Sequence, residues 1–125
     1  MATVEITADT FNDAITENDI VIVDFWAPWC GPCRSFAPTF EKVSEKHTDI
    51  MFAKVNTEEE QDLAGHFQIR SIPTLMIFRE QVVLFAQPGA LSESQLEEVI
   101  GKVRELDMAK VHAEIAAQQD AANQE

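Results

Sequence analysis

Cys30 and Cys33 are the two residues of this sequence best suited to do chemistry. They are its only cysteines, and Gly31 and Pro32 separate them. Positions three apart are neighbours on the first turn of a helix, where two sulfur atoms can approach disulfide distance. The free N–H groups and the positive dipole end of a helix start also favour a thiolate on Cys30. The segment therefore predicts a dithiol that opens and closes as a disulfide.

A cysteine pair also has other uses in proteins. A zinc site usually takes four protein ligands. A second cysteine pair is missing here, and no histidine stands at a recognisable ligand spacing: His47, His66 and His112. We therefore expect neither a metal ion nor a resident cofactor. Two unreactive structural thiols, or an iron–sulfur cluster shared between two chains, stay open as alternatives at this point.

The composition is that of one acidic domain. A chain of 125 residues is long enough to close a core, and a hydrophobic content of 46% argues against disorder. The net charge of −13 argues against nucleic-acid binding. No apolar stretch is long enough to span a bilayer, and residues 1–6 lack the basic and apolar segments of a signal peptide. We therefore expect a cytoplasmic protein without membrane contacts, in which a disulfide is catalytic rather than structural.

The hydrophobic pattern alternates between strands and helices. An apolar run interrupted only by Asp24 predicts a central strand at residues 20–26 that is buried on both faces. Further strands are expected at residues 4–6, 50–55, 75–78 and 81–86. Helices are expected to begin at Thr7 or Asp9, at the cysteine segment, at Thr57 with Glu60 in a capping box, and at Ser92 with Gln95 in a second box. This order predicts an α/β fold with a central mixed β-sheet flanked by helices on both faces.

Two local features interrupt this pattern. Pro38 falls inside the apolar stripe of the helix that runs to about Lys46 and should kink it; the alternative is a separate helix that starts at Pro38. The turn between the last two strands, Arg79-Glu80-Gln81, lacks the glycine or asparagine that tight hairpins favour.

Four further motifs surround the cysteines in a fixed order. They are Phe25-Trp26-Ala27-Pro28-Trp29, Lys54-Val55-Asn56, Arg70-Ser71-Ile72-Pro73-Thr74 and Gly89-Ala90-Leu91. In order and spacing this set resembles the thioredoxin family over roughly residues 4–106. The resemblance implies the thioredoxin fold and a thiol–disulfide oxidoreductase that reduces oxidised protein substrates. It also implies a donor partner, a flavoprotein thioredoxin reductase that uses NADPH.

The resemblance gives the two cysteines separate roles, with Cys30 as the attacking thiol and Cys33 as the resolving thiol. The chemistry agrees, because Cys30 precedes the helix and should be the more exposed sulfur. Asp24 is the candidate base for Cys33, since burial should raise the pKa of a lone acid in a buried strand. Lys54, one strand over, is expected to pair with Asp24 and to moderate that rise. The alternative is an Asp24 side chain that merely points out of a half-buried strand.

A small apolar docking surface for the substrate is expected around the cysteines. The resemblance gives Pro73 a cis peptide bond and places it opposite the cysteines, so that the backbone of Ile72 can pair with an extended substrate segment. The full set is Trp29, Gly31, Pro32, Ile72, Pro73 and Gly89. Trp29 has the alternative of being an ordinary, partly buried aromatic residue. Gln68 and Thr57 depart from residues common in the family, which leaves the substrate range open.

The chain continues beyond the span of the resemblance, so we divide it into a thioredoxin domain at residues 1–106 and a helical extension at residues 107–125. One C-terminal helix is expected over residues 92–117, roughly 39 Å long at about 1.5 Å per residue. Met108, Val111 and Ile115 form a second apolar stripe, which either folds back or meets another chain. Residues 118–125 are polar and expected to fray. We expect a monomer, or weak self-association through the extension.

The predicted function is the reduction of protein disulfides through a mixed disulfide on Cys30. One alternative is a binding module that uses the same surface and whose redox activity is secondary. Another is an oxidase or isomerase of an oxidising compartment, although Gly31-Pro32 resembles the reducing branch of the family.

Overall fold

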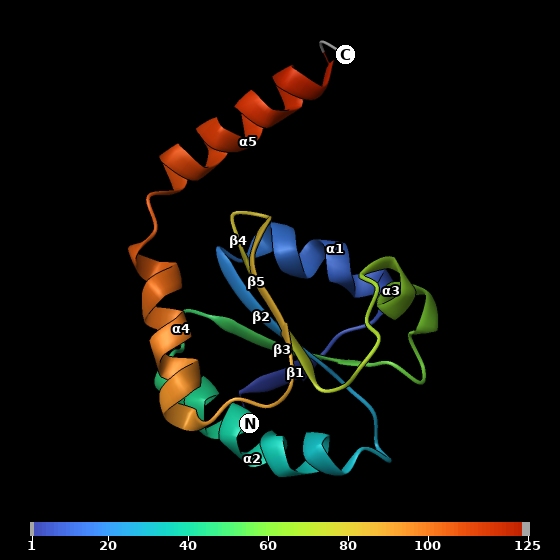
Figure 1. Cartoon of the computed structure of the whole chain (residues 1–125). Helices are drawn as coiled ribbons and strands as arrows, with labels where there is room; N and C mark the ends of the chain where they lie inside the picture. The colour runs from blue at the N-terminus through green and yellow to red at the C-terminus, as the bar shows by residue number, and fades with distance from the viewer. Residues whose placement is uncertain (1, 124–125) are drawn as a thin grey trace.

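Strand β2 (Ile20–Trp26) forms the centre of the sheet in the computed structural model, which describes residues 2–123 (Figure 1). It pairs parallel with β3 (Met51–Asn56) and antiparallel with β4 (Thr74–Arg79). The sheet continues with β1 (Thr3–Glu5) beyond β3 and with β5 (Val82–Pro88) beyond β4. Within residues 2–123 the strand order is β1-β3-β2-β4-β5, so the predicted central mixed sheet is confirmed.

Helices cover both faces of this sheet, as the sequence predicts. One face carries α2 (Gly31–Lys46) and α4 (Glu93–Glu105), and the other carries α1 (Ala8–Glu17) and α3 (Gln61–His66) (Figure 1). Each pair of helices closes its own hydrophobic layer against the sheet. The helices therefore leave neither face of the sheet core open to water.

The alternating side chains of β2 contribute to both layers. Ile20 and Ile22 pack in the layer under α2 and α4, whereas Val21, Val23 and Phe25 pack in the layer under α1 and α3. Successive side chains of a strand point to opposite faces, so a strand between two layers needs apolar residues throughout. This requirement explains the apolar run in the sequence, which only Asp24 interrupts.

Two of the predicted helix starts are confirmed by their hydrogen bonds. Thr7 is the N-cap of α1, and its backbone N–H donates to Thr10 Oγ1 at 2.9 Å. Ser92 caps α4: Ser92 Oγ accepts from the N–H of Gln95 at 3.2 Å, and Gln95 Oε1 accepts from the N–H of Ser92 at 2.9 Å. This reciprocal pair is the capping box that the sequence predicts.

The predicted capping box at Thr57 is wrong. Residues 57–59 form a turn after β3, and α3 begins only at Gln61 with Glu60 as its N-cap. Thr57 is held elsewhere, because its N–H and its Oγ1 both donate to the carbonyl of Trp26, at 2.8 and 3.0 Å. The hydroxyl that would cap a helix therefore ties this turn to the end of β2.

Helix α2 runs without interruption through Pro38, so the alternative of a separate helix starting there is wrong. The kink at Pro38 stays a prediction.

The β4–β5 hairpin has a two-residue turn in which Glu80 and Gln81 both adopt left-handed backbone angles, with φ of 51° and 68°. Positive φ at both central residues is the geometry of a type I′ turn, which glycine and asparagine adopt most readily. The backbone N–H of Glu80 donates to the carbonyl of Asp19 at 2.9 Å, and this bond anchors the turn.

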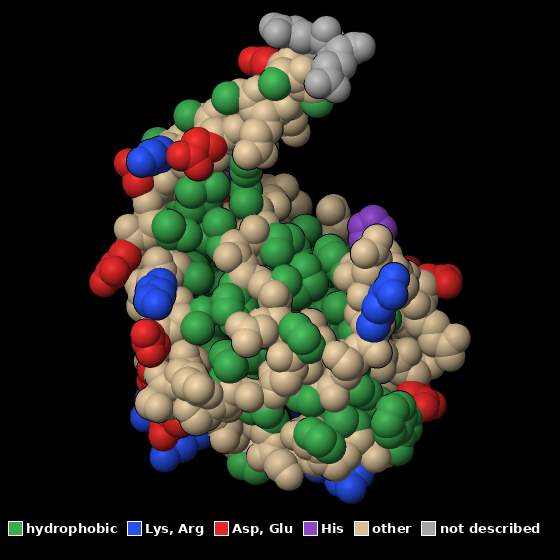
Figure 2. Space-filling model, in the orientation of Figure 1, with side chains coloured by type: hydrophobic (Ala, Val, Ile, Leu, Met, Phe, Trp, Pro, Cys, Tyr) green, Lys and Arg blue, Asp and Glu red, His purple; other side chains and the backbone are tan. Residues whose placement is uncertain are grey.

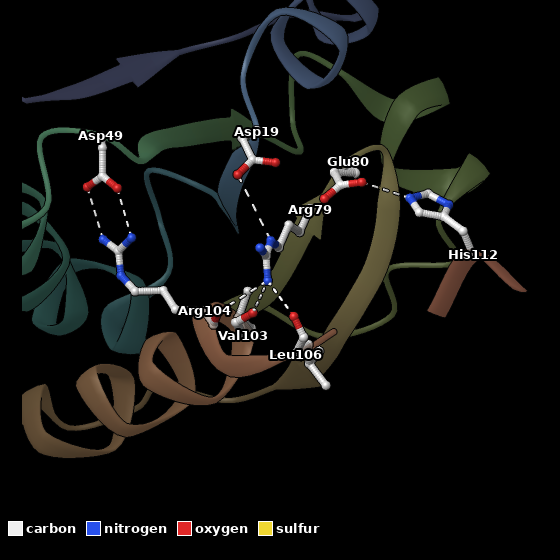
Figure 3. Close-up of polar contacts among 8 residues, drawn as sticks. All are labelled: Asp19, Asp49, Arg79, Glu80, Val103, Arg104, Leu106 and His112. Atoms are coloured by element: carbon white, nitrogen blue, oxygen red, sulfur yellow. Dashed lines mark hydrogen bonds and ion pairs between the residues drawn. The ribbon is translucent and has the colours of Figure 1, made fainter. Parts of the chain in front are cut away.

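The single C-terminal helix expected over residues 92–117 is wrong, because the chain turns out of the helix at Leu106 (φ −64°, ψ 139°). Arg79 explains the break (Figure 3). Its Nη1 donates to the carbonyls of Val103 at 2.8 Å and Leu106 at 3.1 Å, and its Nε lies 4.0 Å from a carboxylate oxygen of Asp19. Carbonyls that would otherwise lack partners at the end of a helix are satisfied by this side chain. A new helix, α5 (Met108–Asn123), starts directly afterwards.

Helix α5 contacts the domain near its first turns and then projects away from it (Figure 1). Met108 is buried, whereas Val111 and Ile115 are partly buried. His112 Nε2 lies 2.9 Å from a carboxylate oxygen of Glu80 in the hairpin turn (Figure 3). The second apolar stripe, Met108, Val111 and Ile115, is therefore only partly buried against the domain. The helix continues to Asn123, and residues 124–125 lie outside the described residues, so the fraying of residues 118–125 stays a prediction.

Apolar side chains gather on one part of the surface (Figure 2). Figure 2 shows hydrophobic side chains gathered on the face between α4 and β5, where a groove is lined mainly by Leu84, Phe85, Val99, Val103 and Leu106. Within the part of the chain that the structure describes, no helix is long and apolar enough to cross a membrane.

Candidate active site

The dithiol lies at the start of α2, as predicted. Cys30 is the N-cap of the helix and Cys33 lies in its first turn, and the two form a disulfide with their Cα atoms 5.2 Å apart. The backbone N–H of Cys33 points at Cys30 Sγ, 3.2 Å away. This N–H and the positive end of the helix dipole would stabilise a negative charge on Cys30 in the reduced protein.

The predicted difference in exposure between the two sulfurs stays a prediction, because in the disulfide form the two residues are almost equally buried. Cys30 is 4% exposed and Cys33 is 3% exposed, because both pack with Ala27 and are covered by Trp26 and Ile72. What distinguishes the two cysteines is their neighbours. Cys30 Sγ lies 3.7 Å from the carbonyl oxygen of Ile72, on the loop predicted to hold the substrate.

Strand register brings the predicted docking residues together. Thr74 at the start of β4 is aligned with Phe25 near the end of β2 and with Pro88 at the end of β5. The loops that adjoin these three positions therefore meet at one edge of the sheet. These loops and the first two residues of α2 carry the set that we call the docking surface: Trp29, Gly31, Pro32, Ile72, Pro73 and Gly89.

Hydrogen bonds hold two of these loops in place. The Ile72–Pro73 peptide bond is cis, as the resemblance implies, and the carbonyl of Pro73 accepts from the N–H of Gly89 at 2.8 Å. Gly89 has φ of +100°, which residues with a side chain rarely adopt. Thr74 Oγ1 donates to the carbonyl of Ser71 at 2.6 Å across the same loop. Thr74 belongs to the motif named from the sequence, but its hydrogen bond to Ser71 was not predicted, because this bond depends on the loop conformation.

Trp29 is 64% exposed, so the alternative prediction that it is an ordinary, partly buried aromatic residue is wrong. Its indole Nε1 donates to the carboxylate of Glu58 on the turn after β3. Asn56 holds that turn, because its Oδ1 accepts from the N–H of Glu58 at 3.0 Å. Sequence reasoning missed Glu58, since it lies 29 positions after Trp29 and nothing in the sequence indicates that the two residues are in contact.

Asp24 is the buried acid of the site, at 1% exposure, which excludes the outward-pointing alternative. It lies two residues after Ile22 on β2, and so it faces the layer of α2, the helix that contains Cys33. Neither of its carboxylate oxygens has a hydrogen-bond partner among residues 2–123. Burial raises the pKa of Asp24 to about 7, the positive charge of Lys54 lowers it, and the carboxylate of Glu5 raises it. The predicted rise is confirmed.

Lys54 lies one strand over from Asp24 and lowers its pKa, as predicted, but the expected pairing of the two side chains does not form as an ion pair. The register aligns Lys54 with Asp24 on one side and with Glu5 on the other, so the three form a row across the sheet. Lys54 Nζ lies 4.5 Å from the ring centroid of Trp26, and residues 2–123 contain no ion pair between Lys54 and Asp24. The ammonium group lies over the aromatic face, and its positive charge lowers the pKa of both Glu5 and Asp24.

A cysteine pair at a helix start, beside a cis-proline loop on a mixed sheet, defines a thiol–disulfide oxidoreductase. A model of the thioredoxin family matches residues 2–102. The chain is 53% identical over 118 residues to a Streptomyces coelicolor protein named "Putative thioredoxin 2", covering 94% of this chain and 88% of that protein. It is 36% identical to the thioredoxin of Bacillus subtilis, covering 82% of this chain and 98% of that one. The chain belongs to the thioredoxin family.

Solved structures agree with this assignment. A mutant thioredoxin from Halobacterium salinarum is similar with a TM-score of 0.78 and 33% identity, covering 84% of this chain and 93% of that one. Chloroplastic thioredoxin z is similar with a TM-score of 0.77 and 28% identity, covering 83% of this chain and 96% of that one. The predicted thioredoxin fold and thiol–disulfide chemistry are confirmed.

Replacing Asp24 by Asn should remove a pH-dependent loss of stability. The pKa of Asp24 in the folded protein, about 7, lies above its ordinary value of 3.8, so the folded state holds this proton more tightly than the unfolded chain. The wild-type protein should therefore lose stability as the pH rises from about 4 through about 7, by on the order of 4 kcal/mol. Urea unfolding of the oxidised proteins should give similar stabilities at about pH 4 and a more stable Asp24→Asn variant at about pH 8. Parallel pH dependences of the two proteins would contradict this prediction.

Proposed function

We propose that this protein reduces disulfide bonds of other proteins. The thiolate of Cys30 attacks one sulfur of the substrate disulfide, and the other substrate sulfur leaves as a thiolate. The thiolate of Cys33 then attacks Cys30 Sγ, which forms the internal disulfide and releases the second substrate sulfur. Two electrons pass from the dithiol to the substrate. The observation that carries this proposal is the position of Cys30 at the start of α2, with Ile72 beside its sulfur.

We assign the supporting roles as follows. Asp24 accepts the proton that Cys33 must lose before it attacks, and a pKa of about 7 suits a proton acceptor near neutrality. Lys54 is a positioning residue that keeps this pKa from rising further. The docking surface holds an extended segment of the substrate, and the backbone of Ile72 pairs with it.

Electrons must return to the Cys30–Cys33 disulfide after each cycle. We propose that a flavoprotein thioredoxin reductase supplies them from NADPH, in the reducing cytoplasm. Both cysteines of the chain lie in the site, so the fold needs no structural disulfide from an oxidising compartment. The protein acts as a monomer, or with weak self-association through α5. Reduction of a protein disulfide that depends on both NADPH and the flavoprotein tests this proposal.

Substitution of the two cysteines should give opposite results. Cys33→Ser should accumulate a mixed disulfide with the substrate, because the resolving thiolate is lost. Cys30→Ser should lose turnover and trap nothing, because the attacking thiolate is lost. Non-reducing gels after incubation with an oxidised protein measure both effects.

The variant with both substitutions is the control for non-covalent association. Trapping by Cys30→Ser alone would reverse the two roles. A wild-type protein that binds partners as tightly as the double variant, without turnover, would favour the binding-module alternative.

Asp24→Asn should slow the second step and leave the first unchanged. At neutral pH the mixed disulfide should resolve at least about tenfold more slowly, since general-base assistance is lost. Stopped-flow measurement of substrate release resolves the two steps. Glu5→Gln is the matched control, because it removes a carboxylate from the same row while Asp24 remains. Equal resolution rates in wild type and Asp24→Asn would remove Asp24 from the mechanism.

We propose that residues 1–106 form the catalytic domain and that residues 107–125 are dispensable for turnover. The family model matches only residues 2–102, and α5 lies away from the start of α2 (Figure 1). The joint between them consists of the buried Met108 and the contact of His112 with Glu80.

Deleting residues 107–125 should leave disulfide reduction within a few-fold of the full chain. It should lower the melting temperature modestly, because burial of Met108 contributes only about 1.5–3 kcal/mol. His112→Ala is the control that removes the Glu80 contact but keeps the helix. Loss of activity in a truncated protein that still folds would place the extension in the substrate or reductase site.

A further inference from the structure

A cavity opens next to the docking surface, between the loop that precedes β4 and the end of β5. Its volume is about 240 Å³. Phe67, Ile69, Met76 and Ala86 supply apolar side chains to its lining. An apolar cavity of about 150 Å³ is large enough to bind benzene. This cavity therefore has room for one aromatic or branched aliphatic side chain.

The cavity and the docking surface share two walls. Arg70 and Ser71 line the cavity and directly precede Ile72, and Pro88 lines it and directly precedes Gly89. The hydrogen bond from Gly89 to the carbonyl of Pro73 joins these walls. A protein segment held at the docking surface would therefore pass beside the opening of the cavity.

The charge around the cavity is unusual for this chain, which has 22 acidic residues. None of the described residues that line it is acidic, and Arg70 is the one that carries a charge. By contrast, the cavity at the start of α3 is lined by Glu58, Glu59, Glu60 and Asp62. A partner with an anionic group would meet attraction at the first cavity and repulsion at the second.

The side chain of Arg70 is exposed and makes no ion pair or hydrogen bond with the rest of residues 2–123. Most other cations of the chain have internal acidic partners, as Lys42 and Lys46 have in Glu93 and Arg104 has in Asp49. Arg70 is therefore free to bind a group from outside the protein.

We propose that this cavity is a specificity pocket for the protein substrate. It takes a bulky apolar side chain, and Arg70 binds a carboxylate next to it on the segment that carries the target disulfide. The proposal deepens the proposed function, on which it rests, because the occupant is the substrate held at the docking surface.

Peptide disulfides test the pocket while a small disulfide tests the chemistry. Each peptide contains one dipeptide, Leu-Glu, Leu-Gln or Ala-Glu. In separate peptides this dipeptide stands one, two, three or four residues from the disulfide-bonded cysteine. The small substrate is hydroxyethyl disulfide, which is too short to reach the pocket. At the best position, wild type should reduce the Leu-Glu peptide with a kcat/KM about fivefold above that of the Leu-Gln peptide.

Three variants separate the parts of the pocket. Arg70→Gln should abolish the preference for Leu-Glu over Leu-Gln, and raised salt should do the same in wild type. Ala86→Phe fills the apolar part and should abolish the preference for Leu-Glu over Ala-Glu. Lys110→Gln is the matched control: Lys110 is exposed on α5, and its loss removes the same charge far from the pocket. All variants should reduce hydroxyethyl disulfide like wild type.

The outcomes against the proposal are distinct. A wild-type protein that shows no preference at any position, or an Arg70→Gln variant that retains the preference, overturns the pocket while the reduction of hydroxyethyl disulfide persists. Failure of the wild-type protein to reduce either kind of disulfide overturns the proposed function itself. Because Arg70 is exposed, Arg70→Gln keeps the test decisive even if Ala86→Phe does not fold.

Discussion

Burial of β2 on both faces is the constraint on which the rest of the structure depends. Two hydrophobic layers enclose this strand, and they take Asp24 out of water together with its apolar neighbours. A buried carboxylate without hydrogen bonds is costly in its charged form, so the pKa of Asp24 rises to about 7. The same layers that stabilise the fold thus create a group that holds or gives up a proton near neutral pH.

The site joins two opposite electrostatic environments. At the start of α2, the N–H of Cys33 and the helix dipole favour negative charge on Cys30. Below it, on the face that β2 turns toward α2, the surroundings of Asp24 disfavour negative charge. In the mechanism that we propose, the start of α2 favours the Cys30 thiolate that begins the exchange, and the surroundings of Asp24 favour uptake of a proton at the next step. Lys54 sits between Asp24 and Glu5 in the register and limits the second effect.

Features with a local cause were predictable from the sequence, and features formed by distant residues were not. The capping box of Ser92 and Gln95, the two-faced strand and the cysteine pair each depend on neighbouring positions, and all three are confirmed. The contact of Trp29 with Glu58, the tie of Thr57 to β2 and the exposure of Cys30 depend on how separate loops meet. The hydrophobic periodicity of the sequence contains no information on which distant loops contact one another. The end of α4 is the plainest case, because the apolar spacing continues past Leu106 while Arg79, from another strand, takes up the carbonyls.

Strand β4 sets the distance between the catalytic end of the molecule and the C-terminal extension. Thr74 at one end of the strand adjoins the Ile72–Pro73 loop, and Arg79 at the other end fixes the close of α4, where α5 departs. Five steps along a strand of about 3.4 Å per residue separate these two positions by roughly 17 Å. Because β4 is paired on both sides, with β2 and β5, it cannot bend to bring its ends together. A contact that moves α5 would therefore act first on Arg79 and the hairpin turn. From there two routes lead to the dithiol: one through the central sheet, and one through α4, which packs in the same layer as α2.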